Sequence, residues 1–454
     1  MISTFFGIEI ARRGLMAGRN AMDVTAHNLA NASTEGYTRQ DPVFSATDPY
    51  TLPNLAQRLL PGQLGTGTEV AQIRRIRDAL LDGQVRDAKG EDGFWQARQD
   101  ALQRVEAVFP EPSDVGLESV LARFFDAWHE LNNNPGDLGL KAVVKEAGEE
   151  LAVNFRHIYR QLSDIEASLR ESVGLKVDRI NEIANELGEL NKQIARIVAN
   201  GNQPNDLLDR RDVLLDELAA MAETDENLNN DGTFDVNIYG EDLVTSGGVV
   251  NTVSAAWSPG LVISIGGVPV NIDNDNIPGS ISGIESARRK IADPTDGYLS
   301  KLDTLAKAVR DDVNGLHDDE AGNLFFDNTG TGAGDLYLSS DIDDVINVAG
   351  TMALDIARLR EDPLTAMPGG TYEAYYRGLV SDIGASAQGS GHQAGTARAV
   401  LQQLENLRQS VSGVSVDEEL TRLVQFQYAY QASARVMTVL DSMLDTLINR
   451  MGVL

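Results

Sequence analysis

Residues 415–454 read SVDEELTRLVQFQYAYQASARVMTVLDSMLDTLINRMGVL, and this stretch decides the fold. Ten of its side chains recur at alternating spacings of three and four residues, and nine of the ten are apolar. They are Leu423, Phe426, Tyr430, Ser433, Met437, Leu440, Leu444, Leu447, Met451 and Leu454. A plain core helix would follow a 3.6-residue period and drift off this seam over 32 residues. The pattern therefore favours a coiled-coil helix, and Ser415 with Glu418 has the spacing of a capping box at its start.

The other end of the chain predicts a second long helix, from about residue 4 to residue 31. Ile8, Leu15, Met22 and Leu29 form one apolar stripe, and the turn-forming residues 31–36 then end the helix. Neither terminal helix can bury its stripe alone. We therefore expect the two ends to pair with each other or with neighbouring subunits.

The middle of the chain is mainly helical, with one β insert. Apolar periodicity predicts a very long helix over about 140–200, a second over 205–221, and a helical stretch over 284–316. Residues 223–283 alternate apolar and polar side chains between Gly and Asn punctuation, which predicts a small β domain.

Weaker signals complete this outline. Residues 37–70 indicate extended chain and loops, and helical character returns near Ile73. A hairpin region is expected near 320–340, and helices from about Tyr372 with a Gly/Ser-rich break at 384–395.

These segments predict an elongated, mainly α chain with nested domains. Residues 1–45 and 411–454 would form an inner assembly domain of terminal helices in an α-helical coiled coil. Residues 46–222 and 284–410 would form a helical rod domain, and 223–283 an inserted outer β domain.

Composition excludes several classes of protein. A formal net charge of −30 argues against nucleic-acid or anionic-membrane partners, because both require a basic surface. The absence of cysteine excludes disulfides, thiol catalysis and thiolate metal sites. No apolar run approaches the roughly 20 residues that span a bilayer. The N-terminal residues lack the pattern of a conventional signal peptide, so any export would use another route.

Candidate chemical sites are weak, so we expect no enzyme, no cofactor and no metal. The five histidines are scattered without metal-ligand spacing. Residues 227–232 resemble the first half of a calcium loop, but Ile238 stands at the twelfth position, where such loops carry Glu. A turn is the better interpretation, although calcium or glycan binding by the insert stays open.

Four motifs carry a family resemblance. Residues 26–37 (AHNLANASTEGY) and 412–434 resemble the terminal signatures of the axial rod, hook and hook-associated proteins of the bacterial flagellum. Residues 205–212 (NDLLDRRD) and 313–317 (VNGLH) resemble the hook-associated members that join hook to filament. His27 departs from the pattern, because the family usually has Asn there.

The resemblance implies a structural adaptor that polymerises through its terminal helices at the hook–filament junction. It implies export through the flagellar type III apparatus and a location in the flagellum outside the cell. Implied partners are a ring of identical subunits, hook protein, hook-associated protein 3 and an export chaperone, without nucleic acid or membrane insertion. The expected assembly interface consists of Ile8, Leu15, Met22, Asn28, Leu29, Asn31, Gly36 and Tyr37, together with Leu423, Phe426, Tyr430, Met437, Leu440, Leu444, Leu447, Met451 and Leu454.

Two alternatives remain open. The chain could be another axial component, namely a hook, rod or cap protein. From a different class, the β insert could be a surface-exposed binding module.

Overall fold

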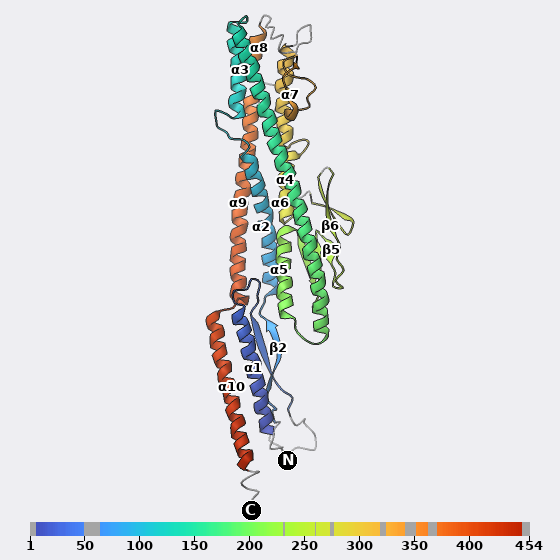
Figure 1. Ribbon diagram of the computed structural model, residues 1–454, viewed down its shortest axis with the longest axis vertical. Coiled ribbons are helices and arrows are strands. Elements are labelled where there is room, and N and C mark those ends of the chain that lie inside the picture. The colour runs from blue at the N-terminus through green and yellow to red at the C-terminus, as the bar shows by residue number, and fades with distance from the viewer. Residues whose placement is uncertain are drawn as a thin grey trace, which may run out of the picture.

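The computed structural model describes residues 6–49, 64–229, 232–258, 260–272, 277–317, 324–340, 351–361 and 370–446. The molecule is elongated, with both termini at one end (Figure 1). A small terminal lobe lies at that end, a helical rod extends from it, and two small sheets lie beside the rod. This confirms the predicted fold class, mainly α with a small β insert.

The terminal lobe contains both ends of the described chain. Helix α1 (Phe6–Ala30) packs along α10 (Val416–Asp445), although about 390 residues separate them in sequence. Strands β1 (Gln40–Ala46) and β2 (Thr68–Arg75) form an antiparallel ribbon that packs on α1.

Long helices that run side by side form the rod. Helix α4 (Leu138–Ala199) has 62 residues, which at 1.5 Å per residue makes it about 90 Å long. It contacts α3 (Leu117–Asn133) and α5 (Asn205–Met221), while α2 (Ala79–Glu106) packs on α9 (Tyr372–Ser412). The described part of the rod also contains α6 (Ser280–Ala292), α7 (Tyr298–His317) and α8 (Met352–Arg358).

An aromatic cluster closes the end of the rod far from the lobe. Phe124 and Trp128 of α3 meet Phe325 and Phe326, which precede the short 3-10 turn η1 (Ala333–Asp335). Asn314 of α7 donates to Phe326 O and accepts from Phe326 N, both at 2.8 Å. The VNGLH motif therefore serves to dock the 325–338 segment onto the helices.

The insert folds as two three-stranded antiparallel sheets against α4. One contains β3 (Thr224–Leu228), β4 (Phe234–Ile238) and β5 (Glu241–Val244). The other contains β6 (Val253–Trp257), β7 (Leu261–Ile265) and β8 (Val268–Asn271). Asn181 of α4 donates to Val253 O and accepts from Val253 N. Asn191 of α4 likewise donates to Phe234 O and accepts from Phe234 N. Asn181 thereby bonds the outer strand β6 of its sheet, and Asn191 bonds β4 at Phe234, before the residues that β4 pairs with β5.

Several local expectations were wrong. Ile73 lies in β2 rather than in a helix, because its strand pairs with residues 40–46. Helix α9 continues through 384–395, since Ile383, Ala387 and Ala394 are buried and the helix packs along α2. The expected helix over 284–316 is two helices, because Asp293 and Pro294 interrupt the pattern. Ser415 is the N-cap of α10 but makes no capping bond, and Glu418 pairs with Arg39 instead of returning one.

Candidate assembly interface

Small residues on α1 form the contact with α10. Gly7, Gly14 and Gly18 face Leu440, Ser433 and Tyr430, and a Cβ built on Gly14 would lie 2.8 Å from Ser433 Oγ. Ala11, Ala21 and Thr25 continue the same three-four spacing and are buried. Bulky side chains on α10 therefore pack into a groove that the small side chains of α1 leave open.

The predicted apolar stripe of α1 flanks this contact. Ile8, Leu15, Met22 and Leu29 are all half-buried beside the small-residue face. The sequence predicts the helix and its large apolar side chains, but it does not single out the small-residue face, because hydrophobic periodicity gives little weight to Gly. The signal that could have located it is the recurrence of small residues at 7, 11, 14, 18, 21 and 25.

The predicted seam of α10 lies on the side that faces α1 and the ribbon. Leu423, Met437, Leu440 and Leu444 are half-buried there. Phe426 is also half-buried, and its ring centroid lies 5.9 Å from that of Phe44 in β1. Tyr430 retains 37% of its surface exposed. Leu447, Met451 and Leu454 lie outside the described residues.

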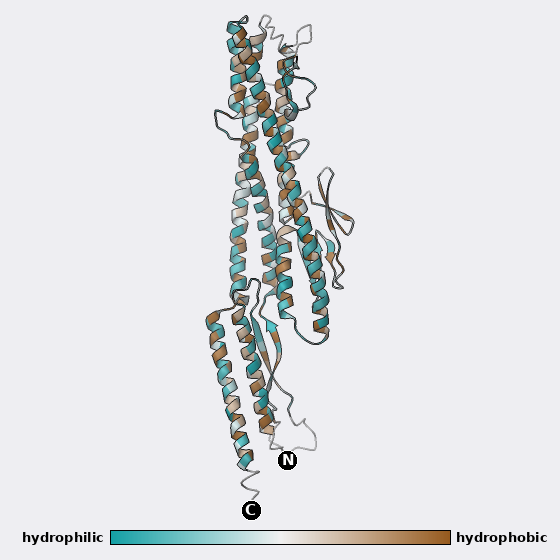
Figure 2. Ribbon diagram, viewed as in Figure 1, coloured by the Kyte–Doolittle hydropathy of each residue, from teal (hydrophilic) through white to brown (hydrophobic). Residues whose placement is uncertain are grey.

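A second apolar stripe on α10 remains uncovered. Its members are Leu420, Val424, Tyr428, Val436, Val439 and Met443, each 43–69% exposed. At 100° per residue they lie on the side of the helix away from the seam. Figure 1 shows α1 on one side of α10 only, and Figure 2 shows that hydrophobic segments recur along α10. We call these six residues the outer stripe.

A buried polar cluster joins the two ends of the chain. Asn28 donates to Gln40 O and to Glu419 Oε2, at 2.8 and 2.9 Å, and accepts from Gln40 N. The hydroxyl of Tyr37 also donates to Asn28 Oδ1, at 2.8 Å. Partial burial and nearby carboxylates raise the pKa of Tyr37, so its hydroxyl keeps the proton that it donates. The cluster fixes β1 and the start of α10 on the last turn of α1.

Two further predicted interface residues act within the chain. Asn31 donates to His27 O at 3.0 Å and so satisfies a carbonyl at the C-terminal end of α1. Gly36 adopts a positive φ of 74° in the turn that follows, a conformation that favours glycine. The turn lies next to α5 of the rod.

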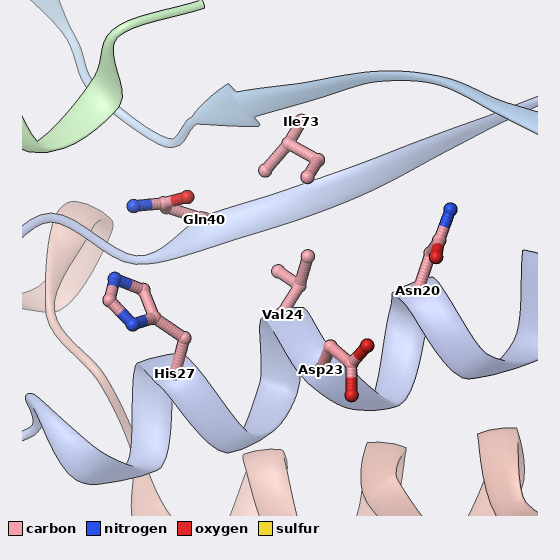
Figure 3. Close-up of a pocket in the computed structure, with 6 residues that line it drawn as sticks. All are labelled: Asn20, Asp23, Val24, His27, Gln40 and Ile73. Atoms are coloured by element: carbon pink, nitrogen blue, oxygen red, sulfur yellow. The ribbon is translucent and has the colours of Figure 1, made fainter.

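A shallow cavity of about 280 Å³ lies between α1 and the ribbon, lined by Asn20, Asp23, Val24, His27, Gln40 and Ile73 (Figure 3). His27 Nε2 lies 3.4 Å from Asp206 Oδ1 of α5. Across the described ranges, no group of three His, Cys, Asp or Glu side chains could hold a metal ion. Residues 230–231 of the calcium-like motif lie outside those ranges.

None of the described helices combines the length and apolar character that crossing a bilayer requires.

Family models match three parts of the chain. Residues 102–335 match the flagellar hook-associated protein FlgK helical domain. Residues 408–451 match the C-terminal model of the flagellar basal body rod FlgEFG proteins. Residues 8–38 match the family model of the flagella basal body rod protein.

Curated relatives match over nearly the whole chain. Flagellar hook-associated protein 1 of Bacillus subtilis is 33% identical over 100% of this chain and 99% of its own length. The protein of the same name from Salmonella typhimurium is 24% identical over 97% of this chain and 99% of its own. A solved structure of the flagellar hook junction protein FlgK from Burkholderia pseudomallei aligns with a TM-score of 0.47 at 21% identity, over 54% of this chain and 46% of that one.

The identity of 33% over the full length and the match of residues 102–335 to the helical-domain model both indicate the same family. The chain belongs to the flagellar hook-associated protein 1 family, whose members are components of the bacterial flagellum.

Proposed function

We propose that this chain is the structural adaptor between the hook and the filament of the flagellum. The names of its full-length relatives support this role rather than that of a hook, rod or cap protein. The observation that carries the mechanism is the outer stripe, because the seam on the opposite side of α10 already meets α1. An exposed apolar stripe of this length is typical of a protein surface that a partner covers.

In this proposal, the outer stripe of each α10 packs against the terminal lobes of sister chains in a ring. The predicted interface residues of the seam hold α10 in place, and their half-buried edges border the contact. Each large apolar side chain that becomes fully buried contributes about 1.5–3 kcal/mol before the loss of entropy is subtracted. Several such contacts for each subunit would hold the ring without covalent links.

Charge placed on the outer stripe tests this mechanism. The double variant Val436→Asp with Val439→Asp, expressed in a strain that lacks the native protein, should leave the chain folded and abolish joining. Electron microscopy should then show hooks without filaments. The matched control is Val143→Asp with Leu175→Asp, because both are exposed apolar positions on α4, away from the stripe. Normal filaments in the stripe variant would refute the proposal.

The partners and the export route form the finer part of the proposal. The ring would contact hook protein on one side and hook-associated protein 3 on the other. The chain would leave the cell unfolded through the flagellar type III apparatus, with a chaperone covering the apolar face of α10 beforehand. The lack of cysteine supports such transit, because no disulfide could form on the way.

The proposed role is structural rather than enzymatic. The terminal residues 1–45 and 411–454 would serve assembly together with strand β2 of the lobe, the helices within 46–222 and 284–410 would serve as a spacer, and the insert 223–283 would face outward up to the start of α6 at Ser280. The charge distribution supports this division, because most of the net negative charge lies outside the two terminal segments.

A further inference from the structure

The terminal lobe joins the rod through two covalent crossings. The chain leaves the lobe after β2, at residues 76–78, and returns to it between α9 and α10, at residues 413–415. Figure 1 shows both crossings where the lobe meets the rod. Two crossings alone define an axis about which the lobe could turn, so a fixed angle needs a third contact away from that axis.

The first turns of α5 supply such a contact. Asn205 donates to Ile73 O of β2 at 2.9 Å and to Gln40 Oε1 of β1 at 3.1 Å. Asp206 Oδ1 accepts from Gln40 Nε2 at 2.9 Å. Helix α5 belongs to the rod, because it packs on α2 and α4.

Asp209 and Asp212 extend the contact by one and two turns. Asp209 Oδ2 accepts from the backbone N–H of Thr38, and its Oδ1 pairs with Arg75 Nη1 at 2.8 Å. The same guanidinium pairs with Asp212 Oδ2 at 2.6 Å, and Arg77 pairs with that oxygen at 2.5 Å. Asp209 and Asp212 are each only 6% exposed. Buried charges demand partners in fixed positions, so these bonds tolerate little movement of β2.

Shape reinforces the charges at this contact. A Cβ added to Gly36 would lie 2.1 Å from Val213 Cγ2 of α5, so the turn of the lobe rests directly on the helix. The approach is this close because residue 36 carries no side chain.

The bonds of Asp216 hold α5 within the rod. Asp216, one turn further along, pairs with Arg86 and Lys89 of α2 and with Arg408 of α9. Asp216 is 8% exposed, much like Asp209, but these partners lie in rod helices. Helix α5 thus faces the lobe with its first turns and the rod with its later ones.

We infer that residues 205–213 of α5 act as a clamp that fixes the angle between the terminal lobe and the rod. The NDLLDRRD motif provides the acidic half of the clamp, and Arg75 with Arg77 provides the basic half. A cavity of about 820 Å³ lies beside the clamp, lined by residues 32–38 of the lobe and by Asp212, Lys89 and Arg408 of the rod. This open space would let the turn swing when the clamp is released.

The inference concerns the free chain and does not depend on what the lobe joins. Only its consequence rests on the proposed function, since a fixed angle would set the direction in which α10 meets its neighbours.

Distance measurements between two spin labels test the clamp. The chain has no cysteine, so Gln193→Cys on α4 and Gln427→Cys on α10 provide two labelling sites, both exposed. Pulsed electron spin resonance on the labelled monomer should give a narrow distance distribution. Asp209→Asn in this background should broaden the distribution roughly twofold, because the lobe then samples several angles.

Asp216→Asn is the matched control, since it removes a charge of similar burial from the same helix. It should lower the melting temperature and leave the width of the distribution unchanged. An unchanged width in Asp209→Asn, or equal broadening in both variants, would overturn the inference. If Asp209→Asn fails to fold, Asp206→Ala at a more exposed position should broaden the distribution in the same sense, and an unchanged width there would equally overturn it.

Discussion

The side chain of Asn28 donates to the carboxylate of Glu419, at 2.9 Å, across 391 positions of sequence. Both groups are 1% exposed, so this bond ties the two ends of the chain together inside the lobe. The amide of Asn28 also donates to Gln40 O and accepts from Gln40 N. One residue therefore holds α1, β1 and α10 together.

We predict that Asn28→Asp destabilises the lobe by about 2–4 kcal/mol while leaving the rod folded. The substitution keeps the volume of the side chain but removes its donor and brings a second carboxylate close to Glu419. Hydrogen exchange should accelerate in β1 and in the first turns of α10, with α4 unchanged. Asn31→Asp, at a half-buried position on the same helix, should have a smaller effect. Equal protection of the lobe in Asn28→Asp and in the native chain would contradict this account of the cluster.

We predict that Gly18→Leu separates α1 from α10. A Cβ on Gly18 already lies 3.5 Å from the backbone of Tyr430, so the rest of a leucine side chain has no room. Overpacking of this kind costs about 1–3 kcal/mol. Thermal unfolding followed by a fluorophore on α10 should shift to lower temperature. Arg19→Leu, at the exposed neighbouring position, should leave the transition in place, and a similar shift in both variants would argue against tight packing at Gly18.

The sequence predicts much of this fold, and the misses have physical causes. Helix α5 begins and ends where periodicity places it, at Asn205 and Met221, and the seam from Leu423 to Leu444 lies on one side of α10. The strand at Ile73 was missed because its partner strand lies about 30 residues earlier, and pairing at that distance leaves no local pattern.

The interface was predicted less completely than the fold. Heptad spacing located the seam of α10. It did not indicate the outer stripe, because α10 is apolar on two sides. It also did not indicate the glycine face of α1. The contact of Asp209 with Arg75 joins residues 134 positions apart, so neither charge looks buried in the sequence.

Acid should weaken the bonds of Asp212. Despite its burial, four surrounding guanidinium groups, those of Arg77, Arg211, Arg75 and Arg86, lower the pKa of Asp212 to about 2. Since an unfolded Asp titrates near 4, the stabilisation is complete above about pH 4 and is lost as the pH falls toward 2. The loss should be on the order of 2 kcal/mol, measured as the change in unfolding free energy in urea. In Asp212→Asn this part of the pH dependence should disappear; an identical pH profile in both proteins would show that Asp212 does not carry it.

Asn181→Ala should loosen the insert without unfolding the rod. Its side chain bonds both backbone groups of Val253, at 2.9 and 2.8 Å, where β6 lies on α4. Arg170 and Arg288 hold the other end of β6 through the ring of Trp257, at 5.1 and 5.2 Å from its centroid, so the insert should remain attached. Amides of β6 and β7 should exchange faster. Asn185→Ala, one turn along α4, should not change them, because Asn185 bonds only the helix backbone.

The central claim is that sister chains cover the outer stripe of α10, and cysteine labelling of assembled flagella tests it most directly. The chain has no cysteine, so Val439→Cys places one thiol on the stripe and Leu175→Cys places one on α4 as a control. We predict that a maleimide labels both thiols in the free monomer, but only Cys at position 175 in the intact flagellum. Equal labelling of position 439 before and after assembly would contradict the account.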